Sequence, residues 1–135
     1  MREIRAKGVC KGQASGPALV SQEPISFLGD LDITTGRIVG DVPSARNATI
    51  GGTVLIFPFG MGSAGAWRFI YQLFKHGTHP VAIVSRELPD PSIVQGSIMA
   101  GIPVVYAPDE NVLQTIRNGE RIEVDGTTGL IRVLA

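Results

Sequence analysis

The residues best suited to chemistry lie in one glycine-rich segment, Phe57-Pro58-Phe59-Gly60-Met61-Gly62-Ser63-Ala64-Gly65. An apolar run precedes it and a helical pattern follows it, so the segment is predicted to join a buried strand to the N-terminus of a helix. Such a junction presents backbone N–H groups and the positive end of the helix dipole, which favour an anion or a developing negative charge. Gly60 and Gly62 would let the backbone approach a ligand closely. Ser63 would hold its hydroxyl over the same place.

The same residues also permit a structural interpretation. Ser63 would then be the N-cap of the helix, worth about 0.5–2 kcal/mol, and the glycines would only form the turn. Two familiar catalytic loops are excluded. A phosphate-binding P-loop needs a Lys directly before the Ser, and a nucleophile elbow needs a Gly where Met61 stands. The segment alone therefore leaves a substrate-binding loop and a capped turn both open.

Classical Ser–His catalysis is not expected. His76 follows Ser63 by 13 residues on the predicted helix, about 20 Å away at 1.5 Å per residue, which is too far for a hydrogen bond. His79 precedes Pro80 and is predicted to be a solvated turn residue. To act as a base, Ser63 would need a metal-bound or strongly electropositive setting, which this chain does not supply by itself.

Two arginines are candidates for holding a substrate carboxylate or phosphate. Arg68 lies in the first turn of the predicted helix, and Arg86 follows the next predicted strand. Open α/β sheets bind ligands at the carboxyl ends of their strands, where both would lie. A solvated surface charge is the alternative for each.

The elements that position these residues change in character at about position 50. Before it, the sequence predicts strands at 4–12 and 17–21 with a connection at 12–16. Residues 25–28 then run into a loop and turn at 29–36. After it, strands and helices alternate, which implies parallel pairing, and the chain closes with a hairpin. The expected elements are strands 53–57, 81–84 and 103–106, helices 66–76, 91–100 and 108–116, and hairpin strands 121–124 and 130–133. This pattern predicts an α/β domain with a second sheet or barrel-like layer.

Composition limits the possible functions. The chain has 135 residues, which fits one domain over 1–135, with 12 Lys+Arg against 12 Asp+Glu and a single Cys. Zero net charge argues against nucleic-acid or anionic-membrane partners. One cysteine cannot build a disulfide, an iron–sulfur cluster or a zinc site within the chain. The charged N-terminus and the absence of a long apolar window indicate a cytoplasmic protein. Low charge with 17 Gly fits either a surface covered by a partner or a turn-rich β domain.

Four blocks in order carry a family resemblance that spans about residues 5–134. They are Ala14-Ser15-Gly16-Pro17-Ala18-Leu19-Val20-Ser21, Pro24-Ile25-Ser26-Phe27-Leu28-Gly29 with its Asp32 to Gly36 turn, Phe57-Pro58-Phe59-Gly60-Met61-Gly62-Ser63, and Gly96-Ser97-Ile98-Met99-Ala100-Gly101-Ile102-Pro103. Together they resemble the small subunit, or swivel domain, of the aconitase X family. The resemblance implies a swivelling β/β/α domain like the mobile domain of aconitases.

The resemblance also implies an activity and a partner. In this family the domain docks on a large subunit that carries iron, commonly an iron–sulfur cluster, and the active site between them dehydrates hydroxy acids. Ser63 would be the catalytic base. Gly60, Gly62, Ala64, Arg68 and Arg86 are the candidate substrate-binding residues, and no metal or cofactor is expected on this chain.

The resemblance implies 5-phosphomevalonate in the archaeal mevalonate pathway as the substrate. The alternatives are a subunit that dehydrates cis-3-hydroxy-L-proline and a non-catalytic swivel or regulatory domain. Two positions depart from the family pattern: Met61 stands where a Lys or Arg is common, and Ala64-Gly65-Ala66 replaces small hydroxylated residues. A phosphate would then be held by Arg68 or by the large subunit.

Overall fold

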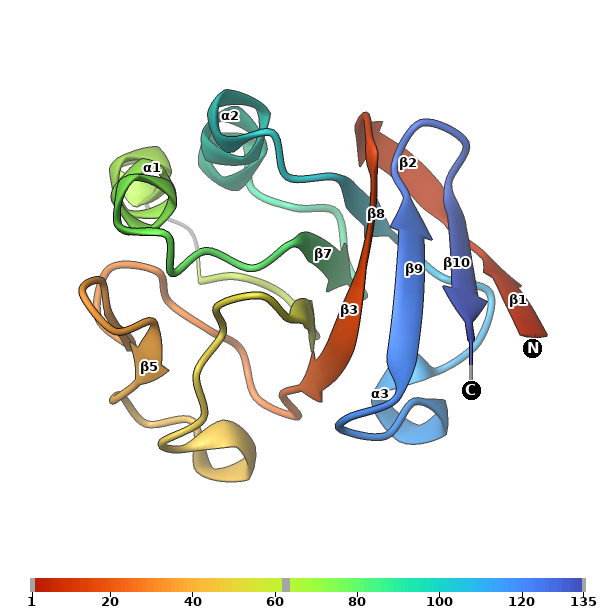
Figure 1. Ribbon diagram of the computed structural model, residues 1–135, viewed down its shortest axis with the longest axis horizontal. Coiled ribbons are helices and arrows are strands. Elements are labelled where there is room, and N and C mark those ends of the chain that lie inside the picture. Colours follow the sequence, from red (N-terminus) through yellow and green to blue (C-terminus); the bar gives the residue numbers. More distant parts are fainter. Residues whose placement is uncertain (1, 62–63, 135) are drawn as a thin grey trace.

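The computed structural model describes residues 2–61 and 64–134 (Figure 1). Within them, strands predominate in the first half of the chain, and strands alternate with helices in the second. The elements in chain order are β1 Arg2–Arg5, β2 Lys7–Cys10, β3 Gln13–Val20, β4 Leu31–Asp32, β5 Arg37–Ile38, the 3-10 turn Pro43–Ala45, β6 Val54–Phe57, α1 Ala66–His76, β7 Ala82–Ser85, α2 Pro91–Ala100, β8 Val104–Tyr106, α3 Val112–Thr115, β9 Arg121–Asp125 and β10 Leu130–Val133.

Eight of the strands in the described residues form one sheet, in the order β1-β10-β9-β3-β6-β7-β8-β2. Its two outermost strands are consecutive in the chain, and only Ala6 separates them. Because neighbouring Cα atoms are about 3.8 Å apart, the two ends of the sheet must meet. The sheet therefore curls into a barrel-like layer (Figure 1), and β9 contacts β6, β7 and β8 across its interior. This confirms the expected barrel-like layer of an α/β domain.

The middle of the sheet is parallel. β3 pairs with β6, β6 with β7 and β7 with β8, all in the same direction. α1 connects β6 to β7, and α2 connects β7 to β8. The two helices pack side by side on one face of the sheet (Figure 1). Both helices therefore start at the same edge of the sheet, at the carboxyl ends of β6 and β7.

Two apolar cores explain why the strand at 54–57 reads as a continuous apolar run. Val54 and Ile56 point into the barrel interior, whereas Leu55 and Phe57 belong to the cluster between the sheet and the helices. A strand buried on both faces has no polar positions to alternate with. β7 is likewise buried on both faces. Ala82 and Val84 belong to the core inside the barrel, and Ile83 belongs to the core between the sheet and the helices.

Gly96 sets the distance between the two helices. A Cβ atom at this position of α2 would lie 2.9 Å from both the Cα of Trp67 and the Cβ of Ile70 on α1. Such a distance is below van der Waals contact, so only glycine allows the helices to approach this closely. Both helices end as predicted, with Gly77 and Gly101 in the left-handed conformation at φ 70°.

The first strands differ from the prediction. The expected strand 4–12 is divided at Ala6, where the chain passes from one end of the sheet to the other. The expected connection 12–16 is wrong, because Gln13 to Pro17 pair antiparallel with β9. This pairing joins residues more than a hundred positions apart and overrides the local turn signal of glycine and serine.

The last helix is also shorter than predicted. The expected helix 108–116 is limited to Val112–Thr115. The N–H of Asp109 instead donates to the carbonyl of Arg5 at 2.8 Å, so the preceding residues tie the chain to β1. No helix in the described part of the chain is long and apolar enough to cross a membrane.

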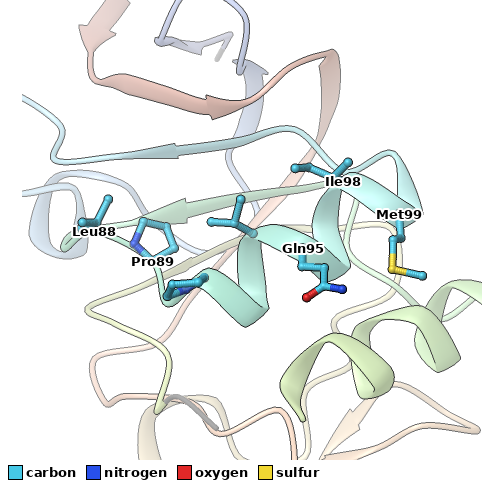
Figure 2. A pocket seen from close by; sticks show the side chains of 7 residues that line it. Leu88, Pro89, Gln95, Ile98 and Met99 are labelled. Carbon is cyan, nitrogen blue, oxygen red and sulfur yellow. The ribbon is translucent and has the colours of Figure 1, made fainter. Parts of the chain in front are cut away.

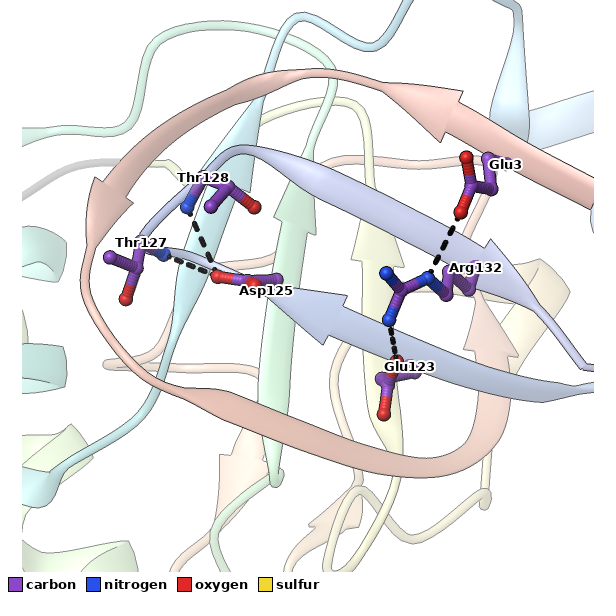
Figure 3. A network of polar contacts seen from close by, with 6 residues as sticks. All are labelled: Glu3, Glu123, Asp125, Thr127, Thr128 and Arg132. Carbon is purple, nitrogen blue, oxygen red and sulfur yellow. Dashed lines mark hydrogen bonds and ion pairs between the residues drawn. The ribbon is translucent and has the colours of Figure 1, made fainter.

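A ladder of charges crosses the exposed side of the antiparallel strands (Figure 3). Arg132 on β10 faces Glu3 on β1 and Glu123 on β9, and its guanidinium nitrogens lie 3.1 and 2.7 Å from their carboxylates. In the turn that follows β9, the backbone N–H groups of Thr128 and, to a smaller extent, Thr127 donate to the carboxylate of Asp125 and lower its pKa. These charges serve strand pairing and the turn, so they are not candidates for binding substrate.

Candidate active site at the loop between β6 and α1

The loop that follows β6 is fastened to the segment around Ile25. The N–H of Ile25 donates to the carbonyl of Phe59 at 3.3 Å, and the N–H of Met61 donates to the carbonyl of Ile25 at 2.8 Å. Gly60 between them forms an isolated bridge with Ile25. The first half of the loop is therefore held in an extended conformation beside a second backbone segment.

Gly60 has a packing role at this point. A Cβ atom on it would lie 2.3 Å from the Cδ1 of Ile93 on α2. Glycine therefore lets α2 approach the loop without displacing the end of the Ile93 side chain. Its predicted part in binding a ligand through its backbone remains a prediction.

Arg86 reaches the same edge of the sheet from the neighbouring strand. Its N–H donates to the carbonyl of Phe57 at 3.0 Å, and the N–H of Glu87 donates to the carbonyl of Pro58 at 3.1 Å. The Arg86 side chain is exposed and forms an ion pair with Glu87 at 3.0 Å. A surface pair of this kind contributes only about 0–1 kcal/mol, so the guanidinium can exchange its partner for a substrate anion at little cost.

The start of α1 is held by a serine that the sequence analysis did not single out. The hydroxyl of Ser92, a buried residue in the first turn of α2, accepts the N–H of Trp67 at 3.0 Å and donates to the carbonyl of Ala64 at 3.1 Å. Ser92 is placed in turn by Asp90, the N-cap of α2, whose carboxylate accepts its N–H at 3.1 Å. No local spacing reveals this bond, because the two helices meet only in the folded chain.

The N-cap position of α1 is Gly65, not Ser63 as one interpretation predicted. Ser63 and Gly62 lie outside the described residues. Their neighbours Met61 and Ala64 are both exposed. The N–H of Met61 donates to the carbonyl of Ile25, and the hydroxyl of Ser92 donates to the carbonyl of Ala64, so both residues are held at the edge where α1 and α2 begin. The role of Ser63 as a base stays a prediction.

Arg68 lies in the first turn of α1, where no acidic side chain offsets the positive end of the helix dipole. Its side chain is exposed and lies over the indole ring of Trp67, with 5.6 Å from the guanidinium carbon to the ring centroid. The stacking orders the side chain and leaves its N–H donors available. The described part of this edge therefore carries two cations, Arg68 and Arg86, and an electropositive helix terminus.

The histidines do not join this edge. His76 lies in the last turn of α1, at the opposite end from the loop, and its Nδ1 lies 2.9 Å from the carbonyl oxygen of Gln72. His79 is not a solvated turn residue as predicted. It is half-buried with its ring against Phe74 at 5.3 Å, and burial lowers its pKa. His79 packs against the last turn of α1, and its position next to Pro80 in the sequence does not predict this contact.

The described residues of this chain do not fit an iron site. No three His, Cys, Asp or Glu side chains among them come together as a possible ligand group. Cys10 is buried, its thiol lies 3.7 Å from the carbonyl of Val94, and burial raises its pKa to about 11. A buried thiol that stays protonated at neutral pH is a poor metal ligand.

Comparison with known proteins places the chain in a family. The family model for the aconitase X swivel domain matches residues 3–133. Proteins named phosphomevalonate dehydratase small subunit are similar over nearly their whole length. The one from Methanocella arvoryzae is 40% identical over 97% of this chain and 98% of its own, and the one from Pyrococcus furiosus is 36% identical over 98% and 96%.

Two solved structures are similar to this chain over nearly all of its length. Thermococcus kodakaraensis aconitase X in its holo-form superposes with a TM-score of 0.91 at 31% identity over the whole of both chains. The solution structure of a UPF0107 protein gives the same TM-score and identity over 99% of this chain and 100% of its own. The expected swivel-domain fold is therefore confirmed, and the chain belongs to the aconitase X swivel-domain family.

Proposed function

We propose that this chain is the small subunit of a two-chain phosphomevalonate dehydratase, a hydro-lyase that removes water from 5-phosphomevalonate and yields trans-anhydromevalonate 5-phosphate. The proposal rests on sequence similarity to relatives of that name. Three of them are 36–40% identical to this chain over 96–98% of its length. The described structure supports this function because the loop after β6 is exposed at the edge of the sheet that carries Arg68 and Arg86. The described residues at this edge form no group of metal ligands. The cytoplasmic location expected above is part of the proposal.

In this reaction the chain would supply a base and side chains that bind the substrate's anionic groups. A C–H bond must be broken beside the carbon that loses its hydroxyl, so that the electron pair forms the double bond while the hydroxyl leaves. In this proposal Ser63 takes the proton. A serine is a weak base unless its surroundings favour the charged form. The start of α1 with Arg68 and Arg86 would contribute to such surroundings, and the large subunit would supply the rest.

The substrate carries a carboxylate and a phosphate, and both need cationic partners. Arg86 and Arg68 are the described groups that can donate to them from the same edge of the sheet. By the family resemblance, Met61 stands at a position where a basic residue is expected. The large subunit is therefore expected to hold part of the phosphate.

We assign the iron or iron–sulfur cluster to the large subunit. Relatives of this chain are named small subunits, and the described residues here lack a ligand group. The large subunit must accordingly supply whatever accepts the leaving hydroxyl. This chain contributes the base and two of the anion-binding side chains.

Co-expression tests the proposal. The chain is purified together with the large subunit from the same organism, loaded with iron under anaerobic conditions, and assayed for water loss from 5-phosphomevalonate and from cis-3-hydroxy-L-proline. Turnover of 5-phosphomevalonate by the complex, with each subunit inactive alone, is the expected result. Turnover of the hydroxyproline alone would replace the substrate. A stable complex that dehydrates neither would favour a non-catalytic domain.

A further inference from the structure

An apolar groove of about 560 Å³ runs along the outer side of α2 (Figure 2). Its lining begins in the segment before the helix and continues to the last turn. We call this surface the α2 face; it is formed mainly by Leu88, Pro89, Val94, Ile98 and Met99, and Gln95 is its polar member. Among the described residues, no charged side chain lines it. A surface of this composition is typical of a contact with another protein rather than of a surface in water.

The exposure of these side chains is unusually high. Leu88 is 67% exposed, Ile98 63% and Met99 44%. Among the described residues, Phe59 and Met61 in the candidate loop are also large apolar side chains that remain exposed. Burying even one such side chain fully strengthens a contact by roughly ten- to a hundredfold. A partner that covers the α2 face therefore gains substantially from contact.

The α2 face adjoins the candidate active site. Leu88 directly follows Glu87, whose N–H donates to the carbonyl of Pro58 at the start of the loop. At the first turn of α2, the Ser92 hydroxyl donates to the carbonyl of Ala64 at the end of the loop. Ser92 is not part of the groove lining, so a chain seated on the α2 face would lie beside the start of the loop, next to Leu88.

We propose that the α2 face is the surface on which the large subunit docks, through an apolar, uncharged segment of that subunit. The identity of the partner rests on the proposed function. The substrate is not the occupant, because its carboxylate and phosphate would find no cation in the groove. In the proposed function the large subunit supplies the remaining reacting groups of the site, and the α2 face is an apolar surface that adjoins the start of the loop. Docking here would bring the loop and the reacting groups of the partner together.

The test measures the dissociation constant of the complex by interferometry with the purified large subunit immobilised. Leu88→Glu and Ile98→Glu place a carboxylate on the α2 face at exposed positions, and Val39→Glu makes the same change at a residue that is 54% exposed elsewhere. Desolvating one unpaired charge in an apolar contact weakens binding by roughly tenfold or more. We expect that loss for both α2-face variants and an affinity within about twofold of wild type for Val39→Glu. Thermal unfolding of each isolated variant verifies the fold.

The outcomes separate the two proposals. If the complex forms and the α2-face variants bind as tightly as wild type, the docking surface is wrong and the proposed function stands. If they bind weakly but the complex dehydrates neither substrate, the docking surface stands and the proposed function is wrong. Absence of any complex with the wild-type chain would overturn both. Self-association of the chain that Ile98→Glu abolishes, with unchanged binding to the large subunit, would assign the α2 face to a second copy instead.

Discussion

Replacing Ser92 by alanine tests how the candidate loop is held. Its hydroxyl makes two hydrogen bonds to the start of α1, one from Trp67 and one to Ala64. Each is worth about 0.5–1.5 kcal/mol net, and Ser92 is 7% exposed, so water cannot replace the hydroxyl without rearrangement. The N–H of Ser92 keeps its bond to Asp90 in the variant, because that bond uses the backbone. Ser92→Ala should therefore destabilise the chain by about 2 kcal/mol and lower its Tm by roughly 6–8 °C.

Urea unfolding followed by circular dichroism and by tryptophan fluorescence measures the change. Trp67 is the only tryptophan and is itself a partner of Ser92, so its fluorescence reports on the affected turn. Ser97→Ala is the matched control. Ser97 is also a buried serine of α2, but its hydroxyl has no hydrogen-bond partner within the described residues. Its removal should change the free energy of unfolding by less than about 0.5 kcal/mol. Equal destabilisation by the two substitutions would refute the role given to Ser92.

Three further changes test other parts of the structure. Gly96→Val forces a side chain into the backbone of α1 and should cost about 1–3 kcal/mol in urea unfolding, whereas Gly29→Ala, with no atom within 4 Å of the added Cβ, should not. Burial raises the pKa of Cys10 from its ordinary value of 9.0 to about 11, so the free energy of unfolding should fall as the pH rises from 9 to 11, and Cys10→Ala should remove that fall. In the assembled enzyme, Arg86→Gln should raise KM for 5-phosphomevalonate roughly tenfold, and Arg46→Gln, which lies in another exposed ion pair, should leave KM unchanged.

The sequence predicted best where burial and local signals agree. Residues 54–57 form a strand that is buried on both faces, and an apolar run without polar positions is the direct mark of that environment. The bounds of α2 follow from Pro91 at its first position and Gly101 beyond its last. Parallel strands bring their carboxyl ends to one edge, so Arg86 was expected near the loop after β6, and its N–H does bond to Phe57.

Prediction failed where a contact joins distant segments. Residues 13–17 pair with β9, and Ser92 bonds to α1. Both contacts join segments that are distant in the sequence, so the local residue pattern does not predict them. The same holds for the half-burial of His79 against Phe74. The low content of charged residues predicted only that some surface is covered by a partner, and it did not locate that surface on α2.

The central claim is that this chain provides the proton-abstracting group of a shared active site, and one measurement tests it most directly. Ser63→Ala is introduced into the purified complex, and kcat for dehydration of 5-phosphomevalonate is compared with that of wild type and of Ser97→Ala. Loss of a general base should lower kcat by roughly 10²-fold or more, while the affinity of the two subunits for each other stays unchanged. Turnover near the wild-type rate by the Ser63→Ala complex would contradict the account.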